Sequence, residues 1–373
     1  MGKQDNGRYR IWFILFFSLL LLLIIGASLS LRILSDMVID MGRSGFAKEA
    51  AWRSGAGVLA SAAIVICLKG IVKRKQGLKG MIGRIFGIAA CLLAIFFLIP
   101  PVILDLPYLD HPETTYLCRL SFDDDLTGDG PVRYDLRGVG IDGSIHSFSV
   151  NAQEYDEGQE QWLEDNELRA KITYLPHTDV VMSLDYLYIL DEQAEELYPS
   201  SASLPDDWQS FAIQINDTVY SLPAPLDTFL KDGWMMSAEE AKLQLPGADE
   251  PYERYRSQDV RLSNAQGQRI DVTVYNTTEE TIDIAQGTVG HLYVIYGDHD
   301  FAGTDLRIPG GLMLGWATRE EVLARYGEPR DEAKDSLIYQ ADDLATERWR
   351  LSFDESGYLD EVMIHAQEYH RND

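Results

Sequence analysis

Three apolar runs dominate the first third of the chain. Residues 11–31 form a run of 21 residues without a charge and residues 85–104 form a run of 20, and each is long enough to cross roughly 30 Å of hydrocarbon as a helix. Residues 55–72 form a run of 18 rich in small side chains and interrupted only by Lys69, which can extend its ammonium group to the membrane interface. The pattern predicts three transmembrane helices; a re-entrant or interfacial helix is the alternative for 55–72.

Beyond residue 104 the pattern changes to that of short strands. Five stretches between residues 113 and 197 alternate polar with aromatic or β-branched residues and are separated by Gly and Asp turns, which predicts a small β-barrel or sandwich. Proline-rich segments divide the rest of the chain. We therefore expect a mostly β, α+β region of three modules, at 113–197, 206–306 and 307–368, after a membrane region at 1–104.

The second module opens with two strands joined by a turn at Asn216 and Asp217. A short helix is expected next, because Leu226 and Phe229 fall on one face at helical spacing and Gly233 follows to end it. The apolar residues of this helix are expected to pack in a core. Further short strands complete a β-rich module.

The third module contains the stretch "GLMLGWATREEVLARYGEP". Thr318 followed three residues later by Glu321 predicts a capping box at a helix start. Gly327 favours the left-handed backbone that ends a helix, and Pro329 prevents its continuation. Three strand patterns come after it, so we expect one helix packed on a three-stranded meander.

Charge is distributed unevenly along the chain. Residues 1–104 hold 13 basic and 4 acidic residues, whereas the remaining 269 residues hold 19 basic and 55 acidic ones. A region so acidic repels nucleic acid, which argues against a nucleic-acid partner. The basic residues gather at the amino-terminus and between the second and third apolar runs, which predicts that these segments are cytoplasmic and that everything after residue 104 is extracytoplasmic. The first run is too long for a cleaved signal peptide and is expected to be an uncleaved anchor.

The chain lacks the sequence patterns of the common catalytic sites. It contains no G-x-S-x-G, H-E-x-x-H, P-loop or dinucleotide-binding glycine pattern. Carboxylate pairs are frequent, but so many acidic residues produce pairs by chance. Cys67 and Cys91 lie in apolar runs and Cys118 is alone in the soluble part, so a disulfide framework is excluded there. We expect no catalysis.

One acidic stretch is a calcium candidate. "FDDDLTGDG" places Asp123, Asp125 and Asp129 at spacings similar to the start of a calcium loop. The position where such a loop needs a bidentate Glu is Tyr134 or Leu136, and no flanking helix is evident. A solvated turn between strands is therefore the alternative.

A second stretch offers ligands for a transition metal. His291, Asp298, His299, Asp300 and Asp305 lie in "GHLYVIYGDHDFAGTD" and carry suitable nitrogen and oxygen atoms. A straight strand would separate the two histidines by some 25 Å, too far for them to share one ion. A polar loop is the favoured interpretation.

Two resemblances bear on location. The runs "INDTVYSLPAPLDTFLKDGW", "IPGGLMLGWATREEVLARYGEP" and "LSFDESGYLDEVMI" within residues 206–366 resemble a family of uncharacterised surface proteins and lipoproteins of Gram-positive, clostridia-like bacteria, which implies a cell-envelope location. The terminal unit is also similar to the helix-and-meander modules of outer-membrane assembly lipoproteins, which bind partner proteins. The residues that match that module pattern are Gly315, Thr318, Glu321, Val322, Gly327 and Pro329.

Together these patterns favour a membrane-anchored extracytoplasmic binding or scaffold protein of the bacterial envelope. Its expected partners are the lipid bilayer and an envelope protein, with self-association through the spans, where Gly80, Gly83 and Gly87 permit close packing. The alternative is a sensory or regulatory membrane protein whose extracytoplasmic part binds an ion or small molecule. Its cytoplasmic loop of 16 residues, 69–84, is too short to be an output domain, so a sensor needs a partner.

Overall fold

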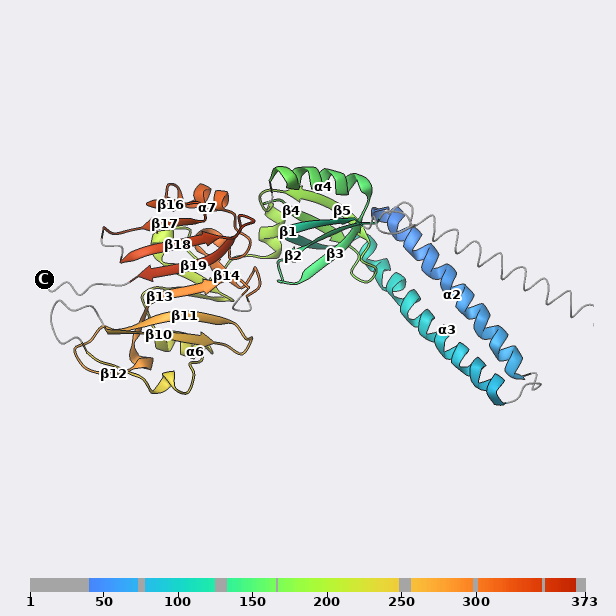
Figure 1. The fold of residues 1–373 in the computed structure, drawn as a ribbon, viewed down its shortest axis with the longest axis horizontal. Helices are drawn as coiled ribbons and strands as arrows, with labels where there is room; N and C mark the ends of the chain where they lie inside the picture. The colour runs from blue at the N-terminus through green and yellow to red at the C-terminus, as the bar shows by residue number, and fades with distance from the viewer. Residues whose placement is uncertain are drawn as a thin grey trace, which may run out of the picture.

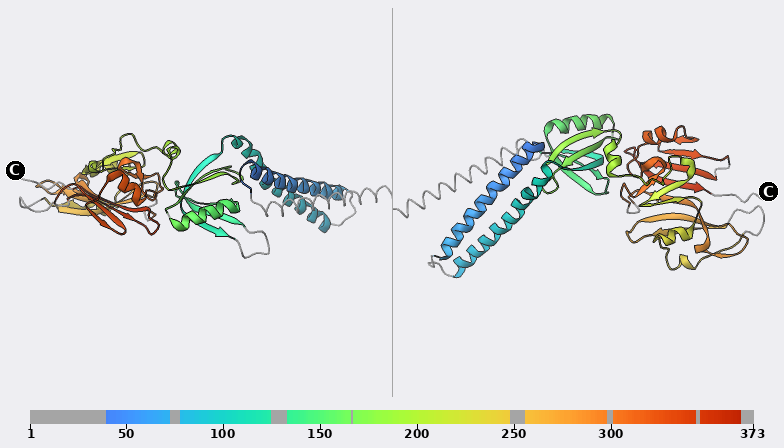
Figure 2. Two further views of the ribbon diagram at one scale, coloured as in Figure 1. Left: turned by 90° about the horizontal axis from the view of Figure 1, so that it is seen from above. Right: turned by 180° about the vertical axis from the view of Figure 1, so that it is seen from behind.

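Three parts follow one another along the molecule: a helical hairpin, a proximal domain (residues 113–197) and a distal domain (206–366) (Figure 1). The computed structural model describes residues 40–72, 78–124, 133–165, 167–247, 256–297, 301–343 and 346–366. The apolar run at 11–31 lies outside the described residues. Two further views show the same order of parts, with the hairpin projecting from the proximal domain (Figure 2).

The hairpin consists of α2 (Gly42–Val72) and α3 (Leu78–Asp105), which lie antiparallel and side by side (Figures 1 and 2). Both helices are long and apolar enough to cross a membrane, and at 1.5 Å per residue each is about 40 Å long or more. Large apolar side chains on α3 remain exposed, including Phe86 at 72%, Phe96 at 67% and Phe97 at 63%. Apolar surface on this scale is unfavourable in water and suits a lipid environment.

The expected spans at 55–72 and 85–104 both fall within these helices. Two of the three expected membrane helices are therefore described. Helix α2 begins at Gly42, well before residue 55, and its amino-terminal half contains the ion pair of Arg53 with Glu49 at 2.5 Å. It lies along α3 as a continuous helix.

A buried carboxylate joins the hairpin to the proximal domain. Asp105, the last residue of α3, is fully buried. It accepts hydrogen bonds from the backbone N–H of His177 at 3.0 Å and from Thr178 Oγ1 at 2.5 Å. Beside it, Phe46 of α2 packs with Leu175 in a small apolar cluster. Such buried, charge-assisted contacts hold the helix end in one position.

The proximal domain is an antiparallel sheet with one helix on it. Its strands run in the order β3-β2-β1-β4-β5. The elements are β1 (Glu113–Asp124), β2 (Tyr134–Gly140), β3 (Ile145–Val150), α4 (Ala152–Glu164), β4 (Arg169–Tyr174), β5 (Val181–Leu187) and α5 (Glu192–Leu197).

The expected barrel or sandwich at 113–197 is not formed, because α4 covers one face of this open sheet (Figure 1). The side chain of Asn151 caps α4 by accepting the N–H of Glu154 at 2.9 Å. Tyr155 and Trp162 of the same helix then pack on the sheet core. The opposite face of the sheet is covered by the distal domain.

The distal domain holds one large and two small sheets. The large sheet has the order β10-β11-β13-β19-β18-β17-β16, with β8 also paired to β13; the others are β15-β14-β6-β7 and β12-β9. The elements are β6 (Ala212–Ile215), β7 (Thr218–Ser221), β8 (Ala224–Pro225), α6 (Leu226–Lys231), β9 (Gln244–Leu245), β10 (Arg256–Ser263), β11 (Arg269–Asn276), β12 (Ile282–Asp283), β13 (Thr288–Ile295), β14 (Leu306–Ile308), β15 (Leu312–Met313), α7 (Arg319–Tyr326), β16 (Asp331–Ala333), β17 (Ser336–Gln340), β18 (Glu347–Phe353) and β19 (Leu359–Ala366).

The boundary expected between 206–306 and 307–368 does not separate two cores. Strand β13 of the first segment pairs directly with β19 of the second, with Val294 opposite Val362. Their buried side chains belong to one hydrophobic cluster. The expected meander of β17, β18 and β19 is present, but it continues a larger sheet because β19 would otherwise be an open edge.

Local predictions in the distal domain agree with the structure. Thr318 and Glu321 form the capping box of α7, and Gly327 follows the helix with φ of 78°. Leu226 and Phe229 of α6 are fully buried in the core. These signals are accurate because each depends on a few neighbouring residues.

Candidate functional site

The two domains meet at an interface closed by aromatic side chains. Tyr116 and Cys118 of β1 pack against Met313 and Trp316 of the distal domain, and Tyr358 completes this buried cluster. The hydroxyl of Tyr358 donates to the backbone carbonyl of Glu167 at 2.9 Å. The side chains on this face of the proximal sheet are therefore buried by a different domain.

Arg169 of β4 is the main charged contact across the interface. Its side chain has no exposed surface, and its two terminal nitrogens donate to the two carboxylate oxygens of Glu321 at 2.9 and 2.7 Å. It also donates to the carbonyl of Trp316 at 2.5 Å. Glu321 accepts the backbone N–H of Thr318 at 2.8 Å as well. One carboxylate thus caps α7 and pairs with an arginine of the other domain.

Arg119 forms a second contact of this kind. Its guanidinium donates to Asp354 at 2.7 and 2.9 Å and to the carbonyl of Gly315 at 2.7 Å. It lies 5.0 Å from the ring centroids of both Tyr296 and Tyr358, a distance at which cation–π attraction operates. Arg119 has a positive φ of 49° beside an irregularity in the β1–β2 register, and this local bend directs the backbone away from regular pairing.

Beside these contacts a cleft of about 620 Å³ opens between the domains. The proximal domain contributes Leu190 and Ala194 to its wall, and the distal domain contributes Met313, Trp316 and Ala317. Helix α7 runs along the cleft, since residues from both of its ends line it. The volume of the cleft is within the range found for small-ligand sites, which are also lined mainly by apolar side chains.

The two ends of α7 give the cleft opposite charges. Glu320 and Glu321 lie in its first turn, next to Glu167 of the proximal domain. Burial, together with the charges of Asp165 and Glu320, raises the pKa of Glu167 to about 7. Glu167 is therefore partly protonated near pH 7.

The other end of the cleft is basic. Arg325 in the last turn of α7 and Arg307 of β14 line it. Arg307 is only 5% exposed, and burial lowers the pKa of its guanidinium. It donates to the carbonyls of Tyr198 at 2.6 Å and Gly311 at 3.5 Å, while its Nε has no hydrogen-bond partner among the described residues. Across the part of the chain that the structure describes, no carboxylate pairs with Arg307. A buried cation without a counter-charge is costly.

A second, more open groove of about 1150 Å³ lies on the outer face of the large sheet. Here His291 of β13 stands opposite His365 of β19, and its Nδ1 lies 3.1 Å from Thr273 Oγ1. Burial, with a contribution from His365, lowers the pKa of His291 to about 4. The ring is therefore neutral near pH 7.

The predicted metal ligands are only partly described. Asp123 at the end of β1 pairs with Arg137 at 2.9 Å, whereas Asp125 and Asp129 lie outside the described residues. Calcium binding there stays a prediction. Asp305 accepts from Gln268 at 2.8 Å, away from His291. Asp298, His299 and Asp300 are also outside the described residues. Within the described ranges, no group of three or more potential metal ligands gathers.

The three interface arginines were not predicted from the sequence. Arg169 lies between the buried residues Leu168 and Ala170, so both faces of its strand are covered. Alternation of polar and apolar residues along a strand predicts one buried face. The second face of this strand is buried by the distal domain, far along the chain: Arg169 and Glu321 are 152 residues apart. No local signal identifies such a contact.

Comparison of the chain with protein-family models, with curated proteins and with solved structures found no match.

Proposed function

We propose that this chain is a membrane-anchored binding or scaffold protein of the bacterial envelope, which holds a ligand or partner site at a fixed position outside the cytoplasm. The proposal rests on two sets of buried polar contacts, which connect the hairpin to the proximal domain and the proximal domain to the distal domain. Asp105 joins α3 to the proximal domain, and the pair of Arg169 with Glu321 joins that domain to the distal one. A loosely tethered domain would not need such contacts.

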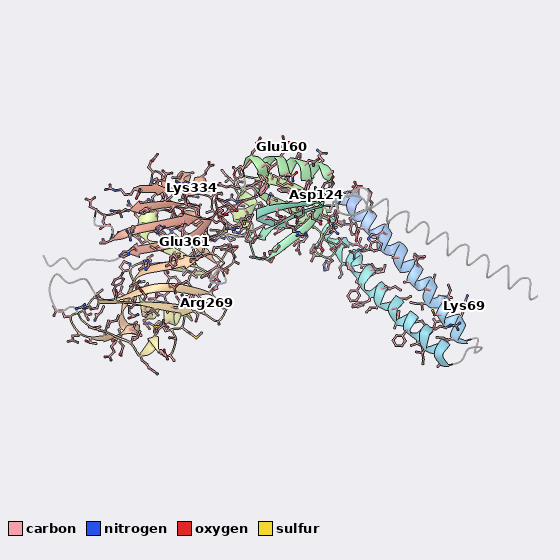
Figure 3. All side chains as sticks on the ribbon, viewed as in Figure 1. Lys69, Asp124, Glu160, Arg269, Lys334 and Glu361 are labelled. Carbon is pink, nitrogen blue, oxygen red and sulfur yellow. The ribbon has the colours of Figure 1, made fainter. Side chains whose placement is uncertain are left out.

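The proposed topology follows from the direction of the hairpin. Lys69 lies near the hairpin tip, away from both domains (Figure 3), and the sequence there carries further basic residues up to Arg84. Basic segments next to spans remain in the cytoplasm. With 11–31 as a third span, the amino-terminus and the tip are cytoplasmic and both domains are extracytoplasmic.

The surface near the cleft suits a protein partner. Tyr188 and Ile189, which line the cleft, are 44% and 68% exposed, and Leu197 close by is 47% exposed. Exposed apolar side chains grouped at a cavity are typical of interaction sites. In the membrane, Gly87 already packs near Cys67 of α2, whereas Gly83 has open space beside it. A second copy of the hairpin could therefore pack against α3 at Gly83, and the proposal includes self-association through the spans at this position.

Crosslinking in living cells tests this function. A photo-activated amino acid at Ile189 is expected to form a discrete adduct with an envelope protein. The same amino acid at Met235, which is 54% exposed in the outer groove of the distal domain, serves as the matched control and is expected to give less of this adduct. The absence of any adduct at Ile189, in cells that contain normal amounts of the protein, would contradict a scaffold role.

A sensory or regulatory role is the second candidate, because the cleft is bounded by two domains and one of them is joined to the membrane hairpin. An ion bound near Asp125 and Asp129 would act on that same proximal domain. A rise in melting temperature at low millimolar calcium, lost on Asp125→Asn and Asp129→Asn substitution, favours the sensor. An unaltered melt favours the scaffold.

A further inference from the structure

We propose that the cleft between the two domains binds a short peptide with free termini, its carboxylate at Arg307 and Arg325 and its ammonium group at the acidic end of α7. This inference rests on the proposed binding role and names the class of ligand. It depends on the charge arrangement of the cleft, the unsatisfied state of Arg307, and the length of α7.

Arg307 supplies the anion site. The guanidinium has five N–H donors, and the two hydrogen bonds that it makes to carbonyls leave the others available. Its Nε is buried without a partner, and no acidic side chain of the described residues compensates its charge. Buried charges in proteins are normally paired. A ligand carboxylate would provide the missing counter-charge.

Arg325 extends the same site toward solvent. Its side chain is 45% exposed, and among the described residues its one ion pair is a long one with Asp206, at 3.8 Å. It packs along Gly310, where an added Cβ would come within 2.9 Å of the arginine Cδ. The glycine therefore leaves space for the side chain beside the cleft. The two arginines can hold a carboxylate from the interior and from the rim.

The opposite end of the cleft suits a cation. The Glu320 side chain is exposed and has no hydrogen bond or ion pair among the interactions of the described residues. Glu321 is already paired with Arg169, and Glu167 lies close enough to Glu320 for mutual repulsion. An ammonium group placed here would be attracted by Glu320 and would relieve that repulsion.

The spacing of these charges sets a lower limit on the ligand length. Glu320 and Arg325 are five residues apart on α7, which is a rise of roughly 7.5 Å along the helix axis, and they also point in different directions around that axis. An extended chain spans about 3.3–3.6 Å per residue, so a ligand that reaches both ends needs at least two residues, and one amino acid is too short. The apolar wall formed by Leu190, Met313 and Trp316 would contact the side chains of the peptide.

Calorimetric titration of the full-length chain in detergent with alanyl-leucine tests the inference. We expect one peptide per chain. N-acetylalanyl-leucine, alanyl-leucinamide and free leucine should each bind about tenfold more weakly or worse, since each loses a charged contact. Equal affinity for the capped forms, or no heat and no thermal shift with millimolar alanyl-leucine, would overturn the proposal.

Variants then assign the two ends. Arg325→Gln and Glu320→Gln change exposed side chains that the fold does not need, and each is expected to weaken alanyl-leucine about tenfold. Arg325→Gln should leave the affinity for alanyl-leucinamide unchanged. Arg307→Gln should abolish binding, with a melting curve to verify folding. Arg261→Gln, on the outer face of the large sheet, is the matched control and should bind normally.

The outcomes separate this inference from the proposed function. Loss of peptide binding with the Ile189 adduct retained would refute the peptide ligand alone. Peptide binding unaffected by Arg307→Gln and Glu320→Gln would place the ligand elsewhere and also refute the inference. Absence of the adduct together with normal peptide binding would contradict the scaffold role and leave the ligand assignment standing.

Discussion

Glu167 and His291 are perturbed by the same physical cause, burial, and respond to pH in opposite directions. Burial disfavours the charged form of each side chain. For Glu167 the charged form is the base, so its pKa is raised from 4.5 to about 7. For His291 the charged form is the acid, so its pKa is lowered from 6.5 to about 4. Neutral side chains are therefore favoured at both positions in the folded protein.

For Glu167 the folded protein binds more protons than the unfolded chain between pH 4.5 and 7. Stability contributed by this group is therefore present at low pH and lost as the pH rises through about 7. We expect the melting temperature of the full chain to fall over this window, and less so in Glu167→Gln. Identical pH profiles for the two proteins would contradict the burial of this carboxyl at the interface.

For His291 the unfolded chain binds more protons between pH 4 and 6.5. The stability linked to this ring is present above pH 6.5 and is lost as the pH falls toward 4. A titration of the His291 ring followed by NMR should give a midpoint near 4, and His291→Asn should reduce acid sensitivity in this window. A midpoint near 6.5 would show that the ring is solvated rather than buried beside His365.

At the scale of elements, α7 connects the two domains through its first turn. Glu321 accepts from Thr318 within the helix and from Arg169 across the interface. The capping box is therefore a local feature with a long-range partner. Its two functions can be separated by substitution, because Thr318 contributes only to the local one.

Arg169→Met is expected to destabilise the protein by about 3–5 kcal/mol, because it leaves the Glu321 carboxylate partly buried and unpaired. Thr318→Ala, which removes only the cap, should cost about 1 kcal/mol. The double variant Arg169→Met/Glu321→Gln should recover part of the loss. Chemical unfolding measures all three. A cost for Arg169→Met no larger than that for Thr318→Ala would contradict a pair that joins the domains.

Short-range interactions determine which elements the sequence predicts well. Thr318, Glu321 and Gly327 identify α7 because caps depend on residues three to four apart. Helix α4 was missed although Asn151 and Glu154 carry a similar signal, because the surrounding strand patterns favoured an all-β interpretation. Local alternation along the strands is correct, but it does not reveal which strands share a sheet.

The cleft could not be predicted from the sequence. Its wall combines residues near 190 with residues near 316, and its buried cation, Arg307, is recognisable only once its lack of a carboxylate partner is visible. His291 was considered with His299 as a possible pair of metal ligands. The histidine that stands beside it is His365, brought there by the pairing of β13 with β19, while His299 lies outside the described residues.

At the scale of the whole molecule, a hairpin, a proximal domain and a distal domain are joined in series. Two helices long and apolar enough to cross a membrane precede a mostly β region with several sheets. The proposed role in the envelope requires that both domains lie outside the cytoplasm. Membrane topology is therefore the property to measure first.

The most direct test is a set of reporter fusions made in the host cell. Alkaline phosphatase fused after Asp373 should be active, and a fluorescent protein fused after Gly77 should fluoresce, since basic segments remain in the cytoplasm. A fusion after Tyr9 should also fluoresce if 11–31 is a span. A fluorescent and phosphatase-negative fusion after Asp373 would place both domains in the cytoplasm and contradict the account.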